Sequence, residues 1–245
     1  MRAILFTAGL ICALGGAAQE KARPGLTAEA IIEKSIQASG GRAAIEKVTS
    51  MVFKGVMGTS VDEMHNPVEY YAKAPNKRLI VMNFEEAGEM RQGFDGKVAW
   101  SQMPMEEAVE VTGAQRANVE REAVFNAALK WRELYPKAEL KGKEKAGDRE
   151  VYAIELTPAA GKPVIQYYDT GTFLLAGQSG NFETPQGPMD IKVEYSDYRD
   201  IGGGVKAPFL TRQVMGMGEV IMKVTEMKIN VEIGDARFAK PAPAK

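Results

Sequence analysis

Cysteine and histidine are almost absent from this sequence, which contains one of each, Cys12 and His65. A typical zinc site takes most of its ligands from these two residue types, so we expect no metal site. A disulfide needs two cysteines, so none is expected within the chain. His65 could serve as a catalytic base for a serine such as Ser60, but no nucleophile-elbow motif surrounds any serine. We therefore expect no enzymatic activity and interpret His65 as a solvated loop residue.

A surplus of basic residues is also missing, because 31 lysines and arginines oppose 32 aspartates and glutamates. Proteins that bind nucleic acid rely on such a surplus to hold phosphate groups. We therefore expect no nucleic-acid partner. The run Gly202 to Gly204 lacks the lysine and the following helix of a phosphate-binding loop, and no cofactor is expected.

The longest hydrophobic run stands at the N-terminus. The basic Arg2 is followed by an apolar stretch from Ala3 to Leu14 and by small residues up to Ala18. These are the three regions of a secretory signal peptide, so we predict a signal peptide at residues 1–18 with cleavage after Ala18. The stretch is shorter than the roughly 18–20 apolar residues of a membrane anchor. The alternative of a lipoprotein, with Cys12 lipidated, is disfavoured by a poor lipobox. Cleavage removes the only cysteine.

The remaining chain is long enough to bury one large core, and we predict a single domain over residues 27–238. A polar linker, 19–26, precedes it, and a disordered tail, 239–245, follows it. Two regions have helical spacing of apolar residues. The first, 28–47, begins after Thr27 as N-cap, with Gly40 and Gly41 ending its main helix. The second, 112–134, carries Val124, Phe125, Ala128 and Leu129, and has capping-box spacing at Thr112 and Gln115.

Most other segments alternate between apolar and polar residues at the period of β-strands. The best local signal is a hairpin with a two-residue turn at Asp95 and Gly96. About ten or eleven strands and two helical regions exclude an alternating β-α-β sheet. We predict a mainly β (α+β) fold, in which helices cover one face of a single, strongly curved antiparallel sheet. The strand segments are predicted at Met51–Met57, Val68–Lys73, Arg78–Phe84, the hairpin Met90–Trp100, Ala138–Lys145, Glu150–Thr157, Val164–Asp169, Leu174–Phe182, Met189–Tyr198, Phe209–Met215 and Glu219–Val231.

Five segments follow one another in order along nearly the whole mature chain: Phe94 to Trp100, Tyr168 to Leu174, Tyr195 to Tyr198, Gly204 to Phe209 and Ile229 to Phe238. Together they resemble segments of periplasmic lipoprotein carriers of the LolA type and their relatives. The resemblance implies an incomplete β-barrel whose concave apolar face holds lipid acyl chains beneath lid helices. In the dedicated carriers, an arginine inside the barrel ties the lid shut, and both Arg78 and Arg91 lie on early predicted strands.

The strands carry the residues that we predict to line an apolar groove. Thirteen methionines are present in the full sequence, and methionine adapts readily to varied apolar partners. The predicted groove residues are Phe53, Tyr70, Met82, Phe84, Phe94, Trp100, Met189, Ile191, Val193, Tyr195 and Met222. The predicted lid residues are Ile32, Ile36, Phe125 and Leu129.

Two functional hypotheses follow. The first is a periplasmic binding or carrier protein that holds a lipid, or the acyl chains of a lipoprotein, between the sheet and its helices, with at most transient membrane contact. The alternative is an envelope sensor or protein-interaction module on the same scaffold, whose groove is filled by its own side chains or by a protein partner's peptide. The volume of the groove distinguishes them, because a ligand site typically encloses about 300–1,000 Å³.

Overall fold

The computed structural model describes residues 26–59, 65–85, 87–184, 187–216 and 218–242. The predicted signal peptide, most of the linker, and Ser60 lie outside these residues. One antiparallel sheet of thirteen strands dominates the described chain. The strands are β1 (Ser50–Gly58), β2 (Asn66–Lys73), β3 (Lys77–Phe84), β4 (Gly88–Phe94), β5 (Ala99–Gln102), β6 (Val109–Glu110), β7 (Lys137–Ala146), β8 (Arg149–Thr157), β9 (Val164–Asp169), β10 (Leu175–Thr184), β11 (Gly187–Asp200), β12 (Lys206–Met215) and β13 (Gly218–Ile229).

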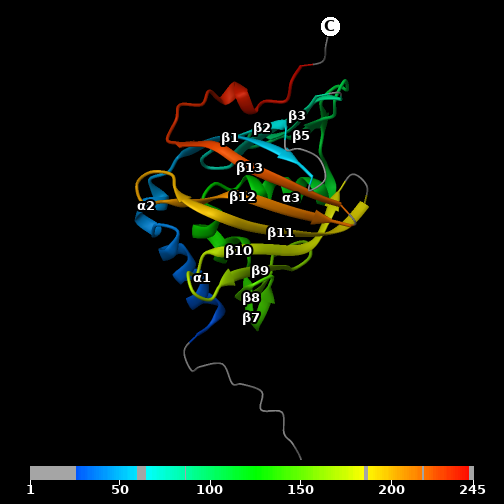
Figure 1. Ribbon diagram of the computed structural model, residues 1–245. Helices are drawn as coiled ribbons and strands as arrows, with labels where there is room; N and C mark the ends of the chain where they lie inside the picture. The colour runs from blue at the N-terminus through cyan, green and yellow to red at the C-terminus, as the bar shows by residue number, and fades with distance from the viewer. Residues whose placement is uncertain (1–25, 60–64, 86, 185–186, 217, 243–245) are drawn as a thin grey trace, which may run out of the picture.

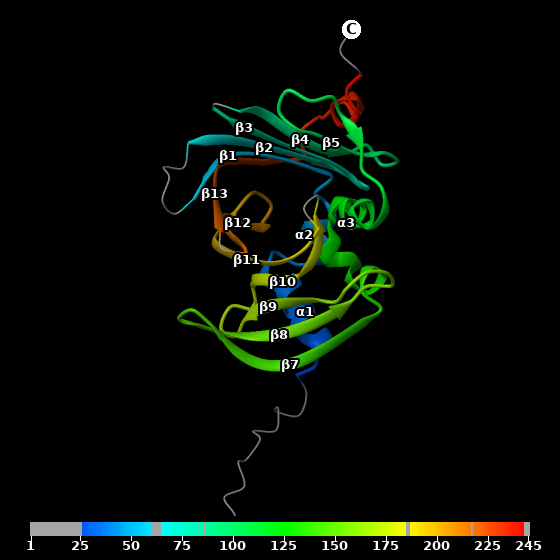
Figure 2. The ribbon, with the colours of Figure 1, turned by 90° about the vertical axis from the view of Figure 1, so that its right-hand side faces the viewer.

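Two meanders make up the sheet. Strands β1 to β6 pair in sequence order to form one wing, and β7 to β13 do the same in the other. The wings join where β1 pairs with β13, while β6 and β7 remain as separate edges. Figure 2 shows the two wings curving toward each other around a concave face. This confirms the predicted incomplete barrel; the strand number is higher partly because two-residue β6 is too short to carry a sequence pattern.

The first helical region folds as predicted. Helix α1 (Ala28–Ala38) is capped by Thr27, whose side-chain oxygen accepts a hydrogen bond from the Ala30 amide at 3.2 Å. A short second helix, α2 (Arg42–Glu46), follows the two glycines. The apolar stripe of α1 packs on the concave face, where Ile31 joins one buried cluster with Ile154. In Figure 1, α1 runs beside strands β9 to β11.

A close backbone contact holds the end of α1 against the β11–β12 connection. A Cβ atom on Gly40 would lie 2.5 Å from the Gly204 carbonyl oxygen, and Gly40 has a φ of +121°. Only glycine tolerates both conditions. Beside this contact, the Lys206 amide donates to the Ser39 carbonyl oxygen at 3.0 Å. The position of α1 over the sheet is therefore set at its C-terminal end.

The second helical region is broken, which corrects the prediction of one continuous helical stretch. Helix α3 (Gly113–Ala123) ends before Phe125, and a 3-10 turn, η1 (Ala127–Lys130), leads into α4 (Trp131–Leu134). Asn126 adopts a left-handed φ of 54°, and its side-chain amide donates to the carbonyls of Ile45 and Val48. The Phe125 amide donates to the Pro75 carbonyl. These tertiary hydrogen bonds replace helical ones, so Phe125 lies at the break and Leu129 in η1.

The Asp95 hairpin joins β4 to β5 through four residues instead of the predicted two, because Phe94 pairs with Ala99. The Asp95 carboxylate accepts hydrogen bonds from the amides of Lys97 and Val98 at 2.8 and 2.7 Å. An aspartate side chain that takes these amides stabilises a wider turn. Among the described residues, no helix combines the length and apolar character needed to cross a bilayer.

The C-terminal segment crosses the convex face of the first wing. Its 3-10 helix, η2 (Asp235–Phe238), buries Phe238 completely. The Trp100 indole N–H donates to the Phe238 carbonyl at 2.9 Å, and Leu79 joins the same buried cluster. Figure 2 shows this segment outside the curve of the sheet. The C-terminal segment therefore covers part of the convex face of the first wing.

We predict that Phe238→Ala lowers the free energy of unfolding by about 3–5 kcal/mol, because it removes a fully buried aromatic ring and leaves a cavity. Urea denaturation measures the change. Lys240→Ala, at an exposed position two residues further on, is the matched control and should leave stability unchanged. Equal stability of the two variants would contradict this role of the segment.

A second prediction concerns Asp235, whose carboxylate contacts the ammonium groups of Lys73 at 2.8 Å and Lys77 at 2.6 Å. Hydrogen bonds from Lys73 and then Lys77 lower its pKa from 3.8 to about 2. A depressed carboxyl pKa adds stability above the unfolded pKa, and this is lost as pH falls through the folded value. Asp235→Asn should therefore be less stable than wild type above about pH 4. In urea denaturation at several pH values, this difference should shrink toward pH 2.

Candidate functional site

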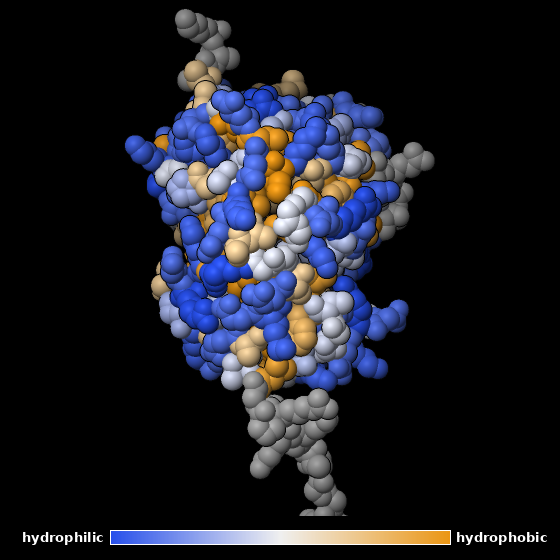
Figure 3. All heavy atoms as spheres, turned by 90° about the vertical axis from the view of Figure 1, so that its left-hand side faces the viewer, coloured by the Kyte–Doolittle hydropathy of each residue, from blue (hydrophilic) through white to orange (hydrophobic). Residues whose placement is uncertain are grey.

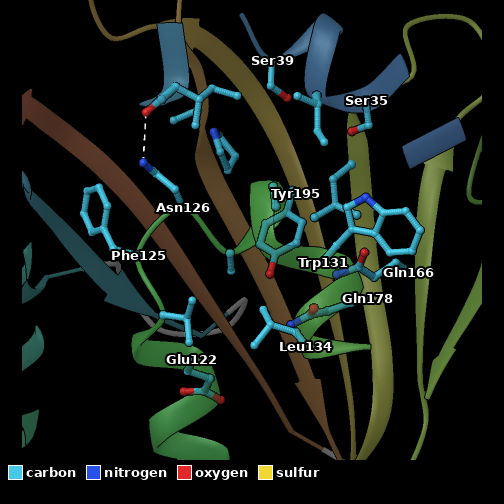
Figure 4. Close-up of a pocket in the computed structure, with 18 of the residues that line it drawn as sticks. Ser35, Ser39, Glu122, Phe125, Asn126, Trp131, Leu134, Gln166, Gln178 and Tyr195 are labelled. Carbon is cyan, nitrogen blue, oxygen red and sulfur yellow. Dashed lines mark hydrogen bonds between the residues drawn. The ribbon is translucent and has the colours of Figure 1, made fainter. Parts of the chain in front are cut away.

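A cavity of about 540 Å³ lies between α1, the segment from Phe125 to Tyr135, and the concave face of the sheet. We call it the α1 cavity. Its lining is largely apolar and aromatic. Figure 4 shows Trp131, Leu134 and Tyr195 around the space, with Phe125 on the far side from Gln166. Side chains that line it include Ile32, Ile36, Ile45, Met51, Tyr70, Ala72, Phe125, Trp131, Leu134, Val164, Tyr168, Leu175, Phe182, Tyr195, Tyr198 and Val205.

The tyrosines of the α1 cavity are uncharged under physiological conditions. Burial, followed by the nearby Glu122 carboxylate, raises the pKa of Tyr195 to about 12. Burial also raises the pKa of Tyr168, whose hydroxyl donates to the Gln166 side-chain oxygen at 2.5 Å. The Tyr198 hydroxyl donates to the Leu175 carbonyl at 2.7 Å. Two of the hydroxyl groups are thus engaged with protein atoms, and the rings supply apolar surface.

A second cavity, of about 430 Å³, lies beneath helix α3, and we call it the α3 cavity. It adjoins the α1 cavity, because Tyr70, Glu122, Gln178, Phe182 and Tyr195 line both. The ring of Phe53 stacks on Tyr70 with centroids 4.9 Å apart. Its lining consists of Phe53, Tyr70, Ile80, Gln92, Gln115, Asn118, Val119, Glu122, Gln178, Phe182, Ile191, Val193, Tyr195, Thr211, Gln213 and Met222.

An ion pair connects the sheet to α3. Arg78 of β3 is buried, and its guanidinium pairs with the Glu122 carboxylate of α3. Burial opposes the charge on Arg78, but Glu122 and Tyr70 together more than offset this and raise the arginine pKa. The Arg78 Nε is buried and has no hydrogen-bond partner among the described residues. Arg91 instead pairs with Glu89 of its own strand, so of the two candidate arginines Arg78 is the one that contacts a helix.

The structure brings part of the predicted groove together. Phe53, Ile191, Val193 and Met222 line the α3 cavity, Ile32, Ile36 and Phe125 line the α1 cavity, and Tyr70 and Tyr195 line both. The remaining predicted residues line neither cavity: Met82, Phe84, Phe94, Trp100, Met189 and Leu129. His65, exposed just before β2, also lies outside both.

The alternation of side chains along a strand explains why Trp100 lies outside both cavities. Phe94 packs beneath α3 with Val119 and Ala123, whereas Trp100 packs against the C-terminal segment on the opposite face. Trp100 pairs with Gly93, the neighbour of Phe94, so the two aromatic side chains point to opposite faces of the sheet. The placement of Trp100 in the groove is therefore corrected.

Sequence reasoning missed the polar part of the site. The amides of Gln92, Gln115, Asn118, Gln178 and Gln213 all line the α3 cavity. A signal existed on α3, where Gln115, Asn118 and Glu122 recur at i, i+3 and i+7 and so share one helix face. The methionine content was a poor guide, because of the methionines in the described chain only Met51 and Met222 line these cavities.

Hydrophobic side chains also reach the surface on the side of the molecule where α1 and α2 lie. Figure 3 shows them in patches down the middle of that face, framed by hydrophilic residues.

No protein-family model matches the sequence, and no curated protein matches it at a significant level. Solved structures do match in fold. A LolA superfamily protein from Nitrosomonas europaea is 16% identical, with a TM-score of 0.57 over 88% of this chain and 98% of its own. A DUF1329 family protein from Desulfovibrio piger is 13% identical, with a TM-score of 0.60 over 86% and 97%.

A third structure, a domain from Vibrio parahaemolyticus named for outer membrane lipoprotein sorting, is 10% identical. Its TM-score is 0.57, over 87% of this chain and 97% of its own. Each comparison spans almost the entire neighbour, so the likeness extends to the whole curved sheet with its helices. This chain therefore has the LolA-like fold.

Proposed function

We propose that this protein binds a lipid, or the acyl chains of a lipoprotein, and carries it through the periplasm without chemical change. The observation that carries the proposal is the pair of adjoining cavities, about 540 and 430 Å³, between the concave sheet and its helices. Both volumes fall in the usual range of ligand sites, about 300–1,000 Å³. The LolA-like fold and the sequence of the N-terminus agree with this setting.

The α1 cavity supplies what an acyl chain needs. Burial of each methylene group contributes about 0.8 kcal/mol, and the residues from α1 and β9 to β11 offer apolar and aromatic surface. The cavity needs no catalytic group for this function, because transfer from water to an apolar surface is favourable by itself. If the protein were instead a sensor whose groove is filled by its own side chains, we would expect a solid interior. Phe125 and Trp131 line the α1 cavity without filling it.

Release requires an element that can open, and α3 fits this role best. Its buried residues are Val119 and Ala123, so it places little apolar surface against the sheet. The Arg78–Glu122 ion pair adds a polar attachment between the helix and β3. Elements with few buried apolar contacts open at low free-energy cost. We propose that α3 moves away from the sheet when cargo enters or leaves, and that an envelope protein receives the cargo.

We predict that Leu175→Trp weakens binding of a fluorescent fatty-acid probe by about tenfold. The larger side chain would occupy the α1 cavity and exclude about two methylene groups of the probe. Probe fluorescence titration measures the affinity. Val214→Trp is the control, because its neighbour Gln213 lines the α3 cavity and strand alternation turns Val214 to the other face. Unchanged affinity in folded Leu175→Trp protein would argue against the α1 cavity as the acyl site.

We also predict that Glu122→Gln loosens α3. The substitution leaves the buried Arg78 guanidinium without its charged partner. Because Glu122 itself is half-exposed, we expect the equilibrium constant for opening of α3 to rise by only about tenfold. Hydrogen exchange of the α3 backbone amides should be faster by this factor, and probe release should accelerate. Glu120→Gln removes an exposed ion pair with Arg116 on the same helix and should have little effect. Equal exchange in both variants would contradict the attachment.

A further inference from the structure

The α3 cavity differs from the α1 cavity in the number of side-chain amides that line it. The α1 cavity has three, of which Asn126 and Gln166 already bond to protein groups and Gln178 is shared. Five side-chain amides line the α3 cavity, contributed by β4, α3, β10 and β12. An acyl chain cannot form hydrogen bonds with such groups. Covering them with an acyl chain costs free energy, because they lose their hydrogen bonds to water. The polar lining therefore calls for a cargo group of a different kind from the one the α1 cavity suits. The five residues are Gln92, Gln115, Asn118, Gln178 and Gln213.

Three of these amides are not engaged elsewhere. The described residues provide no side-chain hydrogen bond to Gln92, Gln115 or Gln178, whereas Asn118 accepts from Arg121 at 2.6 Å and Gln213 donates to the Met215 sulfur. Each free amide offers two donors and an acceptor. A ligand in the α3 cavity therefore meets both kinds of hydrogen-bonding group.

The free amides approach the cavity from three sides. Gln92 lies in a cross-strand row with Tyr70 and Ile80 in the first wing. Gln178 lies opposite Val193 in the second wing. Gln115 belongs to α3, on the helix face that also carries Glu122. A group held between them would be bound by both wings and by α3 at once.

The charges that line the α3 cavity disfavour an ionic ligand. Among the described residues that line it, Glu122 is the single carboxylate, and no lysine or arginine lines it. Glu122 is already paired with Arg78, which neutralises both groups. A phosphate or carboxylate headgroup would lie near the Glu122 carboxylate and would find no lysine or arginine in the lining to bind it. An ammonium headgroup would compete with buried Arg78 for Glu122. The cavity suits an uncharged group that donates and accepts hydrogen bonds.

We infer that the α3 cavity is a headgroup subsite for an uncharged, hydroxyl-rich group such as a glycosyl unit, and that the cargo is a neutral glycolipid whose acyl chains enter the adjoining α1 cavity. Hydroxyl groups donate and accept like the amides that face them, and the stacked rings of Phe53 and Tyr70 provide a flat apolar wall beside them. The inference rests on the proposed acyl-chain binding and assigns the class of cargo.

Competition with a bound fluorescent fatty acid tests this inference. Three competitors with identical acyl chains are compared: monogalactosyl diacylglycerol, phosphatidylglycerol and diacylglycerol. Wild-type protein should bind the galactolipid about tenfold more tightly than either of the others. A tenfold difference in affinity is what about one or two additional hydrogen bonds to the headgroup contribute. In the double variant Gln92→Leu, Gln115→Leu, whose two positions line the α3 cavity and not the α1 cavity, the galactolipid should lose this preference while diacylglycerol binding is retained.

Two controls separate the outcomes. Gln37→Leu, at an exposed position of α1, should keep the wild-type preference, and retained diacylglycerol binding shows that the double variant is folded. If that variant fails to fold, the single substitution Gln92→Leu should reduce the preference part of the way. Equal binding of all three lipids by wild type, tighter binding of phosphatidylglycerol, or a preference that survives in the folded variants would overturn the headgroup subsite alone. Failure of every acyl lipid to displace the probe would overturn the proposed function as well.

Discussion

The antiparallel pairing of β1 with β13 is the contact on which the rest of the structure depends. It joins two meanders into one sheet, with Met51 opposite Ile229 at one end and Gly58 opposite Ile221 at the other. The register shifts at Gly55, where a Cβ atom would lie 2.4 Å from the Lys223 carbonyl oxygen. Such a bulge bends a strand and increases its twist. The curvature gives the sheet a single concave face, and both cavities lie within it.

The helices that cover this face are attached to the sheet with unequal strength. Helix α1 buries a stripe of isoleucines in the main core, which at about 25 cal/mol per Å² of apolar surface is a strong attachment. Helix α3 buries Val119 and Ala123 and turns polar side chains toward the sheet. Its position depends on that small cluster, on the Arg78–Glu122 pair and on a hydrogen bond from Arg116 to the Lys97 carbonyl. The same polar face that weakens its packing gives the α3 cavity its hydrogen-bonding groups, so mobility and ligand chemistry have one origin.

Local patterns predicted most of the strands because each has one face toward the core. The segment from Met189 to Tyr195 alternates strictly and lies within β11, and Val164–Asp169 coincides with β9. The helical region after Thr112 was harder. Apolar spacing through Val124 and Phe125 continued the helical pattern, but hydrogen bonds from Asn126 to Ile45 and Val48 stop the helix. Those partners are distant in sequence, so no local pattern contains them.

By itself, the sequence determined the strand pattern, the capped first helix and the residue types available for a groove, because these depend on neighbours a few positions away. Only the tertiary structure decided which face of each strand looks inward, and hence that Tyr195 lines both cavities while Trp100 meets the C-terminal segment. It also gathered amides from both wings and α3 around one cavity. The physical reason is that a strand side chain's surroundings depend on the strands paired beside it and on what covers its face, which are contacts between residues far apart in the chain.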